Sequence, residues 1–114
     1  MVLLVKASYS NIFYFKFEND LGEPMSLSGL NIKFQIINKK GEQVLLKVIG
    51  NGVLLDPDNP GILGVSISED ESSLLCSLPQ PLSYSLYHET PQGKVILSNG
   101  IIAAYKFSGN ITQS

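Results

Sequence analysis

The chain has 114 residues, a length that suits one domain with one core. Apolar residues make up 44% of it and charged residues only 16%, against a usual charged share of about 25%. Eight basic and ten acidic residues give a net charge of -2 without any basic cluster, which excludes the electrostatic attraction that nucleic-acid binding needs. The low charge favours a subunit packed into an assembly. The single cysteine, Cys76, excludes an internal disulfide framework, and we expect it to be a buried apolar residue.

The sequence begins with a short apolar run, Val2, Leu3, Leu4 and Val5, which stops at Lys6. The run is too short for the apolar region of a signal peptide or for a membrane span. We therefore expect synthesis in a cytoplasm, no signal peptide and no membrane contact, and the opening Met1 fits a complete gene product. Residues 1–10 are interpreted as an N-terminal arm whose apolar strand pairs with an edge of its own sheet or of a neighbouring subunit.

Apolar and polar residues alternate with period two in short segments that are separated by Gly, Pro, Asn and Asp, a rhythm typical of an all-β sandwich. Phe13, Phe15 and Phe17 share one face of the first clear strand and are expected to anchor the core. Gly22 and Pro24 break the sheet after it. The expected strands are 11–18, 30–38, 43–48, 53–55, 62–68, 82–89 and 94–107. The expected inward residues are Leu30, Ile32, Phe34, Ile36, Leu63, Val65 and Ile67, with Leu82, Tyr84 and Leu86 sharing one face later in the chain.

One short helix is expected between two of these strands. Ser68 and Glu71 have the spacing of a capping box, in which the hydroxyl accepts from the third helical amide and the carboxylate accepts from the cap amide. This predicts one or two helical turns over residues 69–75, crossing one end of the sandwich. Leu74, Leu75 and Leu78 are expected to fill that end. Two prolines then end the helix.

The last part of the chain leaves one alternative open. Residues 90–93 predict a hairpin turn into a final strand that contains Asn99-Gly100. This pair indicates either a second hairpin or a bulge within one long strand, and we favour the bulge because the alternation continues through Ile101 and Tyr105. The polar tail, residues 108–114, is expected to be flexible.

Taken in order, the segments from residue 12 to residue 107 resemble the small Ig-like domain of bacteriophage tail and baseplate proteins, including the N-terminal domains of upper-baseplate and tail-fibre proteins. The pieces that carry this resemblance are an aromatic strand, the turn Asn-Asp-Leu-Gly-Glu-Pro-Met-Ser-Leu-Ser-Gly at 19–29, the strand 31–37, the segment Gly-Ile-Leu-Gly-Val-Ser-Ile-Ser at 61–68, the Tyr-x-Leu strand at 84–86 and the hairpin at Gly93. Ser26 departs from the family's usual Asp. The resemblance implies an Ig-like antiparallel β-sandwich with one helical crossover. It also implies a virion structural role, as an adaptor that forms a homo-oligomer and contacts other virion proteins.

The residues that could carry chemistry have simpler interpretations. His88 is the only histidine and no Gly-x-Ser-x-Gly elbow accompanies it, so we expect a structural role for it. Asp56 and Asp58 occupy a Pro-rich loop that could bind calcium, but a plain turn is favoured because no bidentate Glu follows. The acidic residues at 69–71 fit a helix start. We therefore expect no enzymatic activity, no cofactor and no bound metal.

The candidate interface residues are Val2, Leu3, Leu4, Val5, Tyr9, Tyr14 and Tyr87. Tyrosine is a favoured interface anchor because it buries a large area with few rotamers to freeze. Two alternatives to a tail or baseplate protein stay open at this point: a capsid decoration or cement protein, and a carbohydrate-binding module that stacks sugars on exposed rings. The absence of Trp counts against the second, and a small hydrolase built on His88 is the least favoured.

Overall fold

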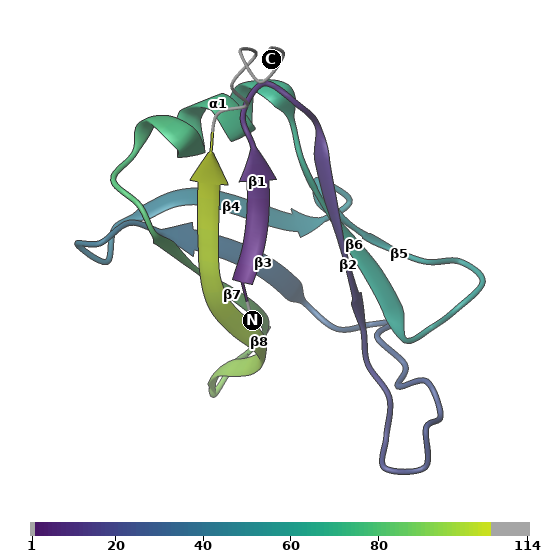
Figure 1. Ribbon diagram of the computed structural model, residues 1–114. Coiled ribbons are helices and arrows are strands. Elements are labelled where there is room, and N and C mark those ends of the chain that lie inside the picture. The colour runs from purple at the N-terminus through teal and green to yellow at the C-terminus, as the bar shows by residue number, and fades with distance from the viewer. Residues whose placement is uncertain (1, 106–114) are drawn as a thin grey trace.

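The computed structural model describes residues 2–105 and shows an all-β protein with one short helix, so the predicted fold class is confirmed (Figure 1). The predictions for Lys106, Phe107 and the tail lie outside the described residues. The elements are β1 (Val2–Lys6), β2 (Asn11–Lys16), β3 (Ile32–Ile37), β4 (Gln43–Ile49), β5 (Gly52–Leu55), β6 (Ile62–Ile67), α1 (Glu69–Ser77), β7 (Leu82–Thr90) and β8 (Gly93–Tyr105).

The strands form one curled sheet in the order β1-β8-β7-β3-β4-β5-β6-β2. Figure 1 shows β1 and β8 running across the direction of β3 and β4, so the sheet encloses its core from opposite sides. The N-terminal strand pairs with its own sheet, where β1 lies parallel to β8. The two edge strands, β1 and β2, meet near the connection between them. There the side-chain amide of Asn11 donates to the carbonyl of Lys6 at 3.2 Å and accepts from its N–H at 3.3 Å, which nearly closes the sheet.

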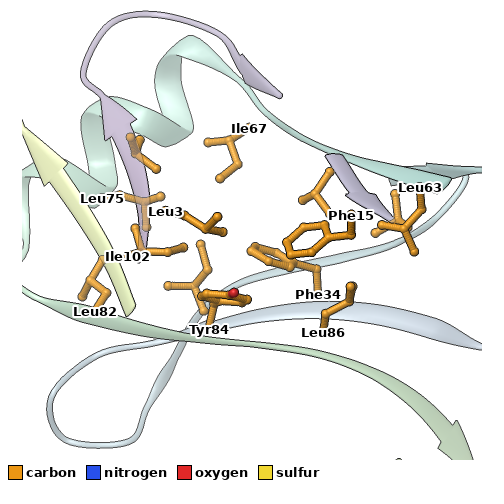
Figure 2. Packing of buried hydrophobic residues seen from close by; sticks show 14 of the residues in the cluster. Leu3, Phe15, Phe34, Leu63, Ile67, Leu75, Leu82, Tyr84, Leu86 and Ile102 are labelled. Carbon is orange, nitrogen blue, oxygen red and sulfur yellow. The ribbon is translucent and has the colours of Figure 1, made fainter. Parts of the chain in front are cut away.

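Three aromatic rings from different strands form the centre of the core (Figure 2). Phe34 and Tyr84 stack with ring centroids 5.5 Å apart, and Phe15 lies 6.4 Å and 6.2 Å from them. The inward faces predicted for β3 and β6 are confirmed, since their alternate apolar residues are fully buried. Phe13 and Phe17 pack against the rim of the core and are only partly buried. The alternation therefore predicted the core face of these strands correctly.

Helix α1 closes one end of the curled sheet, and its capping box is present as predicted. Leu75 is fully buried and Leu78 packs against the core, but Leu74 is 48% exposed, so its predicted role in filling the end is wrong. Successive residues on a helix point about 100° apart. Leu74 therefore points away from the helix face that meets the core, which carries the buried Ser72 and Leu75. Cys76 is half-buried at the edge of the core, less buried than expected.

Strand β8 is one long strand, as favoured, but its bulge lies elsewhere. Asn99 and Gly100 pair regularly with Ser85 and Tyr84 of β7. The register shifts two residues earlier, where Leu97 is the extra residue and packs against the core. The prediction of a bulge at Asn99-Gly100 is therefore wrong in position. The bulge lies at Leu97, where the extra residue turns an apolar side chain toward the core.

Candidate interaction surfaces

Two apolar areas lie on the outer side of the sheet. The first, which we call the β1–β8 face, consists of Val2, Leu4, Ile101 and Tyr105. Their exposed fractions are 56%, 60%, 41% and 44%. The parallel register sets Val2 beside Ile101 and Lys6 beside Tyr105, with Leu4 beside Ala103, so these side chains form one continuous surface on two neighbouring strands. Apolar residues gathered in this way are a feature of contact surfaces, whereas single exposed ones need no explanation.

The same register places Leu3 and Val5 on the opposite side of β1, where they are 8% and 0% exposed and belong to the core. Successive side chains of a strand alternate between the two faces of a sheet. Only Val2 and Leu4 of the predicted apolar run are thus available to a surface partner. Leu3 and Val5 are corrected from interface candidates to core residues of this fold.

The second area, which we call the Tyr14 groove, crosses β2, β6 and β5. Tyr14, Gly64 and Leu54 are neighbours in register across the three strands. Gly64 has no positive φ, but a Cβ there would lie 3.3 Å from Cε1 of Tyr14, so the glycine serves to give the ring room. Tyr14 remains 73% exposed and Leu54 60% exposed. Together with Ile12 and Pro57 they line an open groove of about 340 Å³.

Tyr9 lies in the connection between β1 and β2 and is 49% exposed. The ammonium of Lys6 stands 4.2 Å above the centre of its ring, a cation–π contact. Its carbonyl accepts hydrogen bonds from the amide of Asn11 at 2.8 Å and from the hydroxyl of Ser72 at 2.9 Å. This connection is therefore fixed both to β2 and to the helix.

Tyr87 is only 4% exposed, so its predicted place on an open surface is wrong. It lies between Lys33 and Ile96 in register, and the ammonium of Lys94 stands 4.6 Å above its ring. The long side chain of Lys94 reaches back across the hairpin to cover it, which the sequence pattern does not reveal. Tyr14 and Tyr87 do not form a pair of exposed rings.

The ionisable residues considered for chemistry have structural partners. His88 accepts a hydrogen bond through Nδ1 from the N–H of Asn31 at 2.9 Å. Asp56 accepts from the N–H of Asp58 at 2.8 Å, the turn geometry expected for this loop. Within residues 2–105 there is no cluster of three or more His, Cys, Asp or Glu that could hold a metal ion. No helix in that range is long and apolar enough to cross a membrane.

The most enclosed ion pair joins β4 to α1. Lys47 occupies an inward position of β4 with 11% of its side chain exposed, and its ammonium donates to both carboxylate oxygens of Glu71 at 2.5 Å and 2.6 Å. Glu71 also accepts from the N–H of Ser68. Burial by itself raises the pKa of Glu71, but hydrogen bonds from Lys47 and Ser68 and the charge of Lys47 lower it below the usual value. The pair ties the helix to the sheet.

No protein-family model matches this sequence, and no curated protein matches it. The fold and its surfaces define the class: an all-β sandwich domain with one helical crossover, which carries two apolar areas on the outer side of its described strands. Burial of apolar surface is the chemistry that these areas offer. Ile101, Tyr105 and Gly64 were not among the predicted site residues. The alternation through Ile101 and Tyr105 contained the signal for the first two, whereas the role of Gly64 depends on which strands are neighbours.

Proposed function

We propose that this chain is a virion structural protein of a bacteriophage, located in the tail, the baseplate or the fibre attachment, and that it works as a homo-oligomer through protein contacts without catalysis. The β1–β8 face carries this proposal. It is apolar, continuous and formed by an edge strand, three properties that favour a contact with another protein chain.

The second copy of this chain is the partner that we assign to the β1–β8 face. Fully burying an aliphatic side chain is worth roughly 1.5–3 kcal/mol, so burying the exposed halves of Val2, Leu4 and Ile101 is worth about 1 kcal/mol each. A two-fold contact uses each residue twice, which gives about 6 kcal/mol. This gain is of the same order as the cost of bringing two proteins together. Burial of the face therefore roughly offsets the cost of association, and further contacts within an assembly add net affinity.

The virion setting is supported by the order of the segments between residues 12 and 107 and by the low share of charged residues. A subunit of an assembly is packed against other copies, so it needs less surface charge to stay in solution than a freely diffusing protein does. The alternative of a capsid decoration protein uses the same kind of contact and differs only in the location of the subunit on the particle.

Labelling of virus particles tests the proposal. An antibody raised against the chain, conjugated to gold and applied to purified particles of the phage that encodes it, should label the tail or the baseplate in electron micrographs. Particles lacking the gene product serve as the control. Label on the capsid would replace the tail assignment with the decoration alternative. Absence of the chain from purified particles, by labelling and by mass spectrometry, would overturn the virion role altogether.

A further inference from the structure

We infer that β1 is an exchangeable strand: the β1 of one copy takes the place of β1 beside β8 of a second copy. This inference rests on the proposed self-association and adds to the contact through the β1–β8 face an exchange of β1 between the two copies. An exchange of identical elements between copies creates a dimer without requiring any new complementary surface.

Strand β1 is the part of the fold that is most easily transferred. It lies at one end of the strand order, β8 is its only neighbour in the ladder, and residues 7–10 alone join it to β2. Its transfer would leave a slot beside β8. A substitute must fit Leu3 against Ile102 and Val5 against Ala104 in the same register. Val5 is fully buried, so the slot accepts few other shapes, and the occupant that matches it is β1 of a second copy.

The connection that β1 would pivot on is strained. Ser8 has a φ of 65° and is the only non-glycine residue with positive φ among residues 2–105. This left-handed conformation is unfavourable for residues that have a Cβ. Extending residues 7–10 toward a second copy frees Ser8 from it. Strain in a short connection of this kind favours exchange.

Hydrogen bonds from two elements hold the closed form against this strain. Ser72 of α1 is fully buried, and its hydroxyl lies 2.9 Å from the carbonyl of Tyr9 and 2.8 Å from that of Glu69, between which it shares its proton. Asn11 donates to the carbonyl of Tyr9 and pairs with the backbone of Lys6. A strained conformation persists only where its surroundings fix it. Ser72 and Asn11 therefore act as a latch that opposes exchange.

The closed and exchanged forms share every contact between β1 and β8. Their balance then depends on the strain at Ser8, on the latch and on the protein concentration. High concentration, as in a growing assembly, favours the exchanged form. Because exchange leaves the outward side chains of β1 beside those of β8, the β1–β8 face is rebuilt from two chains.

A disulfide trap distinguishes the two forms. Val5→Cys and Ala104→Cys place thiols on register partners of β1 and β8, in a chain that also carries Cys76→Ser. The matched control carries Gln35→Cys and Ser85→Cys, which are register partners on the central strands β3 and β7. Both proteins are oxidised at high concentration, their mass is measured by light scattering, and they are then separated by non-reducing denaturing electrophoresis.

We expect the variant with cysteines at residues 5 and 104 to give covalently linked dimers or larger species, and the control variant to give single chains. If light scattering shows the first variant to be oligomeric but electrophoresis gives single chains, the exchange is overturned and the proposed self-association still stands. A protein of single-chain mass throughout would overturn both. Free thiols at residues 5 and 104 in the folded protein would contradict the β1–β8 pairing in either form.

Two further variants test the balance by changing the connection and the latch. Ser8→Gly removes the strain and should lower the dimer association constant by about fivefold for each of the two connections in a dimer. Ser72→Ala removes one half of the latch and should raise the fraction of chains that the disulfide trap links into dimers. An unchanged or opposite response in both variants would contradict the role of this connection.

Discussion

The ion pair between Lys47 and Glu71 gives the sharpest prediction about stability. Glu71→Gln keeps an oxygen that can accept from the N–H of Ser68, so the helix cap survives, because Gln is accepted at this position of a capping box. The substitution removes only the negative charge. Lys47 is then left on an inward position of β4 with 11% of its side chain exposed and without its counter-charge.

Removing one partner of a fully buried ion pair costs about 3–5 kcal/mol. Glu71 keeps 26% of its side-chain exposure, which lets water reach the pair and reduces this figure to about 2 kcal/mol. For a domain of this size the loss corresponds to a fall in melting temperature of about 8 °C. Lys47→Met combined with Glu71→Gln should recover most of the loss, since an apolar side chain then replaces a charge without a partner.

Urea unfolding at neutral pH measures the effect. Glu69→Gln is the control because it removes a negative charge from an exposed position in the first turn of the same helix, at a cost of a few tenths of a kcal/mol.

The pH dependence has a definite sign. The folded state holds the pKa of Glu71 below its usual 4.5, so the carboxylate stabilises fully above that pH and progressively less as the pH falls through the lower folded value. The deficit of Glu71→Gln should therefore narrow in acid. Equal losses in Glu71→Gln and Glu69→Gln would refute the reasoning.

Three further predictions concern other contacts. Gly52→Ala should cost about 2 kcal/mol or more in urea unfolding, because its Cβ would lie 2.3 Å from Cδ of Lys47 and its φ is +100°, whereas Gly50→Ala, in open space at φ +83°, should cost about 1 kcal/mol. Ser68→Ala removes the helix cap and should lower the melting temperature by about 4 °C, a loss of about 1 kcal/mol; an unchanged value would mean that the cap adds nothing. Tyr87→Ala should cost about 3 kcal/mol and Tyr14→Ala less than about 0.5 kcal/mol in thermal unfolding, with the reverse order contradicting the burial of Tyr87.

The alternation of apolar residues predicted the strands and their inward faces because it is a local property with period two. The capping box at Ser68 and Glu71 was equally local, and it predicted the start of the helix. By contrast, the parallel partner of β1 is nearly a hundred residues away in sequence. Nothing near Val2–Lys6 specifies β8, so the sequence left open whether this strand joins its own sheet.

The candidate site shows the same division. The exposure of Val2 and Leu4 depends on which face of β1 meets the core, and that follows only from the pairing with β8. Tyr87 looked exposed because its cover, Lys94, comes from the other arm of a hairpin. No local pattern indicates that Lys47 faces inward on β4, because its partner Glu71 meets it from the helix. Each of these features needs contacts between segments, which periodicity does not encode.

Sedimentation of the purified chain over a wide concentration range tests the central claim, self-association through the β1–β8 face, most directly. The unaltered protein should reach a mass that is a multiple of a single chain. Leu4→Lys should weaken the association at least about tenfold, while Leu54→Lys, an equally exposed leucine of the Tyr14 groove, should leave it unchanged. A single-chain mass at the highest concentration, or equal behaviour of the two variants, would contradict the account.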